Sequence, residues 1–252
     1  MSVAESESTP SNAAIVAEGL TRQFGSTVAV DSLDLHISQG AVYGFLGPNG
    51  AGKTTTIEML TSLLPPTAGE AWVAGVSVRN RDQLKTHIGY LPHESPVYES
   101  FTAREQLGYA ADLRQLDAET ADARIEELLT RVDLLDAADT RIGSYSQGMR
   151  RKVGLIQALL HEPEVAFLDE PTNGLDPRAS RTVIELIKEQ VTTGTTVFLS
   201  SHILPVVEEL ADTIGVLYKG KLVAEDSPER LTADRNTTLE EAFLDITTDR
   251  PV

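Results

Sequence analysis

Gly47-Pro48-Asn49-Gly50-Ala51-Gly52-Lys53-Thr54 is the stretch that decides the fold, because its glycines, lysine and hydroxyl residue have the spacing of a phosphate-binding loop. It lies between an apolar run at residues 41–46 and a helical pattern at residues 53–64. Glycines let backbone N–H groups surround phosphate oxygens, and a helix N-terminus adds partial positive charge. Lys53 would reach the β- and γ-phosphates, and the Thr54 hydroxyl could ligate Mg²⁺. The stretch predicts a nucleotide site; the alternative is a glycine-rich turn that binds nothing.

Two carboxylates follow a second apolar run, at residues 165–168: Asp169 and Glu170. In an open parallel sheet, ligands bind outside the carboxyl ends of the strands, so both side chains would face the phosphate loop. We expect Asp169 to hold Mg²⁺ through its water shell, because Mg²⁺ gives up water reluctantly. We expect Glu170 to polarise a water molecule in line with the γ-phosphate. Taken alone, the pair would be a solvated strand end; beside a phosphate loop it predicts a hydrolytic site.

The composition limits the class of protein. The chain has 252 residues, 38 acidic and 21 basic, with a net charge of −17 and no cysteine. Disulfides, thiol catalysis and cysteine-ligated zinc are therefore excluded, and the diffuse negative field argues against nucleic acid as a partner. No apolar run approaches the roughly 18 residues of a spanning helix, and Glu5 and Glu7 stand where a secretory signal would be positive. We expect a cytoplasmic protein, either simply acidic or adapted to a salty cytosol.

Periodicity along the chain predicts an α/β fold. Short β-like runs at residues 15–37, broken at Gly25 and Asp31, indicate an antiparallel sheet near the N-terminus. Residues 102–153 are almost wholly helical in pattern, and strands alternate with helices from residue 165 onward. Such alternation predicts a mostly parallel sheet covered on both faces, with the helical block inserted into it. Residues 1–12 are polar and predict a disordered lead-in.

Three further motifs complete the pattern. They are Tyr145-Ser146-Gln147-Gly148-Met149, the run Asp169-Glu170-Pro171-Thr172-Asn173-Gly174-Leu175-Asp176-Pro177, and His202 after Leu199-Ser200-Ser201. With them the chain resembles the ATP-binding-cassette (ABC) ATPases from about residue 16 to residue 227, most of all cassettes of the ABC-2 and multidrug-exporter type. The resemblance implies a P-loop NTPase domain at residues 13–230, with a helical subdomain inserted at about residues 95–160. Residues 231–252 would form a C-terminal helical tail.

The resemblance also implies roles for particular residues. Glu170 and His202 would act in hydrolysis, with His202 contacting the γ-phosphate, and Thr54, Asp169 and His93 would lie at the metal. Phe24 would stack on adenine. The remaining ATP-binding positions would be Gly47, Pro48, Asn49, Gly50, Ala51, Gly52, Lys53, Thr54, Thr55, Ser146, Gln147, Gly148 and Asp176.

Two positions depart from the family pattern. The signature more often runs Leu-Ser-Gly-Gly-Gln, whereas Gln147 and Met149 stand third and fifth here. Ser146 and Gly148 still supply a hydroxyl donor and a backbone open to close approach, and Ser146 suits the N-cap of the following helix. His93 stands where the family usually has glutamine. Neutral, it can hydrogen-bond a metal-bound water; protonated, it would place a cation beside the metal.

Two kinds of partner are implied by the resemblance. The active site is split between two cassettes arranged head to tail, so one copy of each motif implies a second chain in an ATP-dependent homodimer. A separate transmembrane permease subunit would carry the solute and hold this chain at the inner face of the membrane. Residues 92–101 offer either a docking surface for it or an ordinary packed loop. The signature and residues 238–246 favour export; the alternative is a soluble ABC ATPase of iron–sulfur cluster assembly.

Overall fold

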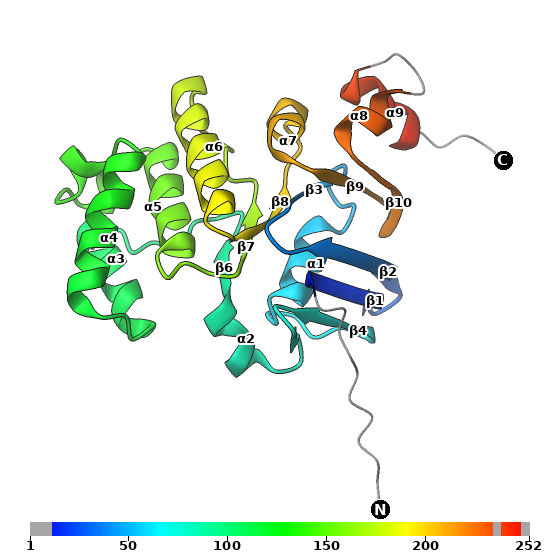
Figure 1. The fold of residues 1–252 in the computed structure, drawn as a ribbon, viewed down its shortest axis with the longest axis horizontal. Helices are drawn as coiled ribbons and strands as arrows, with labels where there is room; N and C mark the ends of the chain where they lie inside the picture. The colour runs from blue at the N-terminus through cyan, green and yellow to red at the C-terminus, as the bar shows by residue number, and fades with distance from the viewer. Residues whose placement is uncertain (1–11, 234–237, 248–252) are drawn as a thin grey trace, which may run out of the picture.

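The computed structural model describes residues 12–233 and 238–247, which form two β-sheets with helices packed around them (Figure 1). The predicted lead-in lies outside the described residues except for Asn12, whose carbonyl accepts a hydrogen bond from the Gln39 N–H at 3.2 Å. In the described ranges, every helix is too short or too polar to cross a bilayer.

The smaller sheet is antiparallel, as the N-terminal pattern predicts, and has the order β2-β1-β4-β5. Its strands are β1 (Ala13–Phe24), β2 (Thr27–Ser38), β4 (Ala68–Val73) and β5 (Val76–Ser77). The break predicted at Gly25 is confirmed, since this residue turns the chain between β1 and β2 with a φ of +57°. The break predicted at Asp31 is wrong. Strand β2 continues through it and absorbs the irregularity as a bulge at Ser32, which has a φ of +50°.

The larger sheet carries the site and has the order β10-β9-β3-β8-β7-β6. Its strands are β3 (Val42–Leu46), β6 (Ile88–Leu91), β7 (Val165–Asp169), β8 (Thr196–Ser200), β9 (Thr213–Tyr218) and β10 (Lys221–Asp226). All neighbouring pairs are parallel except the β9–β10 hairpin, so the mostly parallel sheet is confirmed. Every residue of β3, β7 and β8 is buried, because helices cover both faces of this sheet.

Helices surround the larger sheet and form a block of their own beyond its β6 edge (Figure 1). They are α1 (Lys53–Leu60), α2 (Arg81–His87), α3 (Ala103–Leu113), α4 (Ala118–Arg131), α5 (Gln147–Leu159), α6 (Pro177–Thr192), α7 (Leu204–Leu210), α8 (Pro228–Ala233) and α9 (Leu239–Thr247). The block of α3, α4 and α5, green in Figure 1, lies between β6 and β7 in sequence, as the inserted helical subdomain predicts. Helix α1 is shorter than predicted: it ends at Leu60, because Ser62 takes a φ of +60° and cannot continue the helix.

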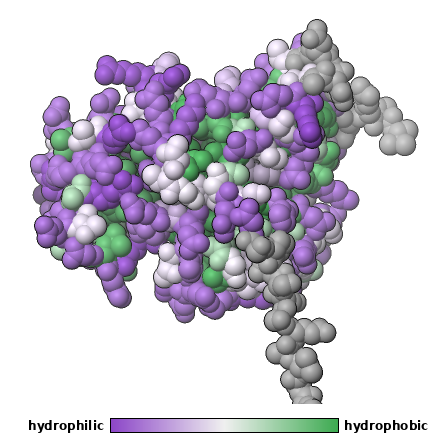
Figure 2. Space-filling model, in the orientation of Figure 1, coloured by the Kyte–Doolittle hydropathy of each residue, from purple (hydrophilic) through white to green (hydrophobic). Residues whose placement is uncertain are grey.

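Aromatic side chains anchor the sheet beneath the site. Phe45, Phe167 and Phe198 come from β3, β7 and β8 and are fully buried, with ring centroids 5.1 and 5.6 Å from that of Phe198. These three rings place a close-packed core beneath the strand ends that carry the site. By contrast, the face of the molecule shown in Figure 2 is mostly hydrophilic. Within the helical tail predicted at residues 231–252, α9 forms and buries Leu239 and Ala242, while residues 234–237 and 248–252 lie outside the described residues.

Candidate functional site

The phosphate loop connects β3 to α1 and depends on glycine at two close approaches. A Cβ on Gly47 would lie 2.5 Å from the Leu217 carbonyl oxygen, and one on Gly52 would lie 2.4 Å from the Ala29 carbonyl oxygen. Gly52 is the N-cap residue of α1 and has a φ of +112°, which few side-chain-bearing residues adopt. A glycine has no side chain with which to cap the helix. The N-terminus of α1 is therefore left for an anion.

Lys53 holds a positive charge inside this loop. The side chain is 9% exposed, and its Nζ donates to the carbonyl oxygens of Gly47 at 2.6 Å and Pro48 at 3.3 Å. Burial lowers the pKa of Lys53, and the nearby carboxylates of Glu170 and Asp169 oppose that shift. An ammonium group held by backbone carbonyls and facing two carboxylates is placed to bind a phosphate group.

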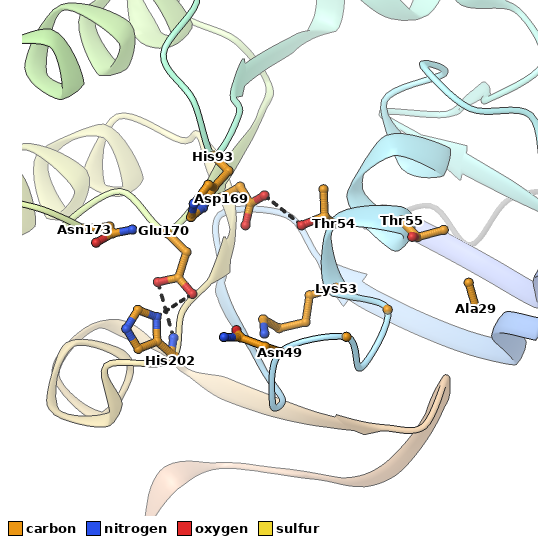
Figure 3. Close-up of a pocket in the computed structure, with 12 residues that line it drawn as sticks. Ala29, Asn49, Lys53, Thr54, Thr55, His93, Asp169, Glu170, Asn173 and His202 are labelled. Atoms are coloured by element: carbon orange, nitrogen blue, oxygen red, sulfur yellow. Dashed lines mark hydrogen bonds and ion pairs between the residues drawn. The ribbon is translucent and has the colours of Figure 1, made fainter. Parts of the chain in front are cut away.

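Thr54 and Asp169 face each other across the cavity (Figure 3). The Thr54 Oγ1 donates to Asp169 Oδ2 at 3.1 Å, and the Ser200 hydroxyl donates to the other carboxylate oxygen. Adjacent oxygen ligands of an octahedral Mg²⁺ are separated by about 2.9 Å, given metal–oxygen distances of 2.0–2.1 Å. The pair therefore fits Mg²⁺, which proteins commonly bind with one or two side-chain oxygens together with substrate phosphates. No cluster of three or more acidic, histidine or cysteine ligands occurs among the described residues.

Both carboxylate oxygens of Glu170 accept hydrogen bonds. Glu170 follows β7 directly, lies in the left-handed region with a φ of +57°, and is 5% exposed. The His202 Nδ1 lies 2.8 Å from Oε1, and Oε2 accepts from the Ser201 hydroxyl at 3.2 Å and from the His202 backbone N–H at 3.3 Å. A carboxylate that only accepts requires Nδ1 to carry the proton. The imidazole lies beside the Glu170 carboxylate (Figure 3), and the His202 side chain is 57% exposed whereas that of Glu170 is 7% exposed.

These groups line one cavity of about 620 Å³. Its lining residues are Ala29, Asn49, Gly50, Gly52, Lys53, Thr54, Thr55, His93, Asp169, Glu170, Asn173 and His202. The structure therefore brings together the sequence-predicted loop, both carboxylates, the histidine after β8 and His93. Gly47, Pro48 and Ala51 shape the loop without lining the cavity. Gln147 lines a neighbouring cavity of about 390 Å³, which His93 and Asn173 also border.

Besides Gly47, Pro48, Ala51 and Gln147, four more predicted ATP-binding residues lie outside the main cavity: Phe24, Ser146, Gly148 and Asp176. The Ser146 Oγ accepts from the Met149 N–H at 3.2 Å, so its predicted role as the N-cap of α5 is confirmed. Asp176 caps α6 in the same way. Phe24 ends β1 and is 46% exposed, with the Arg22 guanidinium 4.5 Å from its ring centroid. Its stacking on adenine stays a prediction.

Sequence reasoning missed several residues that support the site. Ser200 and Ser201 hold the two carboxylates, and Asn173 and Ala29 line the cavity. The hydroxyl pair has a sequence signal, because it ends a strand whose apolar pattern predicts a place in the same parallel sheet. Arg151 donates to the backbone carbonyl of Asp169. Arg151 has no such signal, because a basic residue in a helix indicates solvent exposure by default.

Comparison with known proteins places the chain in a family. A sequence profile described as ABC transporter matches residues 30–173, more than half of the chain. The daunorubicin resistance ATP-binding protein DrrA3 of Streptomyces coeruleorubidus is 41% identical over 222 residues, covering 88% of this chain and 70% of the relative. The bacitracin transport ATP-binding protein BcrA of Bacillus licheniformis is 41% identical over 211 residues, 82% of this chain and 67% of the relative.

Solved structures agree with the sequence relatives. The ATP-binding subunit of an ABC transporter superposes with a TM-score of 0.87 at 27% identity, covering 93% of this chain and 99% of that one. A dimeric ATP-binding cassette in a post-hydrolysis state, bound to ADP and Pi, has a TM-score of 0.78 at 23% identity over 84% of this chain and 98% of its own, and shares the fold. Kinship along most of the chain and a common architecture lead to one conclusion: the protein belongs to the ABC transporter family, as an ATP-binding and ATP-hydrolysing subunit that powers transport.

Proposed function

We propose that the protein hydrolyses Mg-ATP in a head-to-tail homodimer and thereby drives export of a solute through a separate transmembrane subunit. The observation that carries this proposal is the convergence of Lys53, Thr54, Asp169 and Glu170 in one cavity, while Ser146 lies outside it. The ATPase unit comprises residues 13–230, with the helical subdomain at about residues 95–160 and the tail at residues 231–252. One chain supplies a phosphate loop and a base, and leaves the N-terminus of α5 for another chain's nucleotide.

The residues of the cavity have different roles in hydrolysis. Lys53 binds the β- and γ-phosphates, and the N-terminus of α1 adds partial positive charge. Glu170 accepts the proton of the attacking water, and His202 keeps that carboxylate in place through Nδ1. Thr54 and Asp169 hold Mg²⁺, which when bound neutralises charge on the phosphate oxygens.

The N-terminus of α5 supports the dimer. Ser146 caps this helix, and a Cβ on Gly148, one residue inside it, would lie 3.0 Å from Leu175 Cδ2. A helix N-terminus with a hydroxyl at its cap is suited to an anion. Because the phosphate loop of the same chain covers only part of a triphosphate, a second chain's α5 supplies charge neutralisation that one chain lacks.

An exposed aromatic group in the helical block supports docking on a permease. Tyr98 is 53% exposed and Tyr109 is 41% exposed, and their ring centroids lie 6.0 Å apart, with the Phe101 ring within 6.1 Å of both. Exposed aromatic side chains are enriched where proteins meet. Docking there places the chain at the inner face of the membrane.

The names of the relatives favour export. One relative is named for daunorubicin resistance and one for bacitracin transport. Both names describe movement of, or resistance to, organic antibiotics, which supports export of such a compound over the alternative role in iron–sulfur cluster assembly.

The proposal is tested first by the mass of the protein in solution. Glu170→Gln should be monomeric without nucleotide and should double in mass with Mg-ATP, as measured by light scattering. The double variant Lys53→Ala/Glu170→Gln is the control and should stay monomeric, because it lacks the phosphate-binding cation. An unchanged mass of Glu170→Gln would argue strongly against the dimer. Co-purification with the membrane protein of the neighbouring reading frame, followed by an efflux assay, tests export.

A further inference from the structure

Arg151 is a charged side chain of the helical block that reaches the catalytic strand. It lies in α5 and is 4% exposed. Its Nη1 donates to the carbonyl oxygens of Pro92 and His93, the latter at 3.0 Å, and lies 3.5 Å from the Ser95 Oγ. Its Nη2 donates to the backbone carbonyl of Asp169. One guanidinium therefore joins the loop after β6 to the end of β7.

These contacts connect α5 to two segments that line the nucleotide cavity. The loop after β6 carries His93, β7 ends at Asp169, and Glu170 follows it; all three residues line the cavity. Helix α5 begins at the cap residue Ser146, little more than one helical turn before Arg151. A movement of α5 along its axis would therefore shift both the His93 loop and the carboxylates.

Only arginine matches this set of acceptors. A guanidinium presents five N–H donors in a rigid plane, whereas a lysine ammonium is a compact charge on a flexible stem. Burial lowers the pKa of Arg151 to about 10, which leaves it charged at neutral pH, and the Asp169 and Glu170 carboxylates oppose the shift. Without Arg151, the buried Asp169 carbonyl and the part-buried carbonyls of Pro92 and His93 would lose this donor.

Close packing brings the helix near enough for these bonds. Gly154 lies one turn further along α5, and a Cβ there would be 2.8 Å from the Ser95 Oγ and 2.9 Å from Leu91 Cδ1. The absence of a side chain at Gly154 lets α5 rest directly on the end of β6 and the loop that follows. The link is therefore short and rigid.

We propose that Arg151 is a positioning residue for ATP hydrolysis: it holds the His93 loop at a set distance from the Asp169–Glu170 carboxylates and passes the position of α5 to them. The inference deepens the proposed function and rests on it. When Ser146 of one chain engages the nucleotide of another, α5 and Arg151 move as one body. The hydrolytic carboxylates of the first chain then respond to what its own α5 has bound.

The test compares two arginines that donate to backbone carbonyls of other elements, changed in the same way. Arg151→Met removes the guanidinium and keeps much of the side-chain volume. The matched control is Arg114→Met: Arg114 is a half-buried arginine at the C-cap of α3 that donates to the carbonyl oxygens of Lys85 at 3.1 Å and Ile88 at 3.4 Å. It ties the helical block to the other end of β6, away from the cavity.

We expect Arg151→Met to lower kcat by about 10- to 100-fold with KM for ATP changed less than about threefold, because misplaced catalytic groups cost rate more than binding. Hydrogen exchange of the nucleotide-free protein should show faster exchange at residues 92–99. Mn²⁺, used as a probe for Mg²⁺ and followed by electron paramagnetic resonance with ATP present, should bind more weakly. Arg114→Met should lose thermal stability and keep the kcat, the exchange at residues 92–99 and the Mn²⁺ affinity of the parent.

Arg151→Lys keeps the charge but not the planar fork, so its kcat should fall between those of Arg151→Met and the parent. If Arg151→Met does not fold, Arg151→Lys tests the proposal in its place: a parental kcat in Arg151→Lys would overturn the proposal. Equal losses of kcat in Arg151→Met and Arg114→Met would show that Arg151 only stabilises the fold, and this result would also overturn the proposal. If the parent itself hydrolyses no ATP, the proposed function fails, and unchanged loop exchange and Mn²⁺ affinity in Arg151→Met would then separately refute the link.

Discussion

At the scale of single residues, the roles proposed for Lys53 and Glu170 belong to different steps, and one substitution at each separates them. Lys53→Ala removes the cation that we propose binds the β- and γ-phosphates, and it should abolish tight ATP binding. Glu170→Gln removes a positioned base and should keep ATP binding while turnover falls by about 10²-fold or more. Calorimetry measures the first effect and phosphate release the second. If both variants bound ATP equally well, the role of Lys53 would be wrong.

His161 makes stability depend on pH, far from the cavity. Its Nε2 lies 2.9 Å from the Ile88 carbonyl oxygen, and its buried Nδ1 has no partner. Burial, aided by the Arg114 charge, lowers the pKa of His161 from 6.5 to about 4. The folded protein thus binds fewer protons than the unfolded chain between these values. The stability that neutral His161 contributes is complete above pH 6.5 and is lost as the pH falls toward 4.

We expect the free energy of unfolding to fall by about 1 kcal/mol between pH 6.5 and pH 5.5 through this residue, a range in which most carboxylates stay ionised. Urea unfolding of the parent and of His161→Gln at both pH values measures it, and His161→Gln should lack this loss. His36→Gln, at an exposed histidine of β2, is the control and should keep the parental dependence. Equal pH dependence in the parent and His161→Gln would contradict the assignment.

At the scale of elements, β6 and α5 pack backbone to backbone at Gly89. A Cβ on Gly89 would lie 2.0 Å from the Ala158 carbonyl oxygen, an atom of the helix backbone that cannot turn aside. Gly89→Ala should therefore destabilise the fold by about 1–3 kcal/mol and lower Tm by about 2–4 °C for each kcal/mol. Thermal unfolding followed by circular dichroism measures the change.

Gly108→Ala provides the same substitution without the clash. Gly108 lies in α3, and a Cβ there would meet no atom within 4 Å. Because alanine favours a helix by about 1 kcal/mol over glycine, Tm should rise or stay level. A lower Tm in Gly108→Ala than in Gly89→Ala would mean that the contact between β6 and α5 does not set the cost.

At the scale of the whole molecule, the net charge of −17 makes the chain repel itself. The outer face in Figure 2 is mostly hydrophilic, which suits a charged and well-hydrated surface. Added salt screens like charges, with a Debye length of about 10 Å at 0.1 M and about 3 Å at 1 M. We expect Tm to climb substantially from about 0.1 M to about 2 M KCl, since this range covers most of the screening.

A variant with less charge provides the control. Asp122→Asn, Glu208→Gln and Glu240→Gln together remove three carboxylates at exposed positions. The triple variant should melt higher than the parent in low salt and should gain less from KCl. A Tm that is independent of salt in the parent would remove the interpretation of adaptation to a salty cytosol.

The catalytic loop and strand could be predicted from sequence because each is a contiguous motif. The phosphate loop, Asp169 and Glu170 each lie beside an apolar run, so local pattern gives both their residues and their element. The boundaries of other elements could not be predicted in this way. The pattern of α1 continues to Leu64, yet Ser62 turns the chain, and β2 passes through Asp31 by means of a bulge. In both places backbone geometry overrides the pattern of side chains.

By itself, then, the sequence determined the family, the order of strands and helices, and the residues that form the phosphate loop. It could do so because strand, loop and helix follow one another along a few neighbouring residues. Only the tertiary structure decided that Ser200 and Ser201 hold the two carboxylates, that Phe24 lies outside the cavity, and that Arg151 joins α5 to β7. Hydrogen bonds between residues far apart in the chain form only when separate elements pack, and no local pattern encodes their geometry.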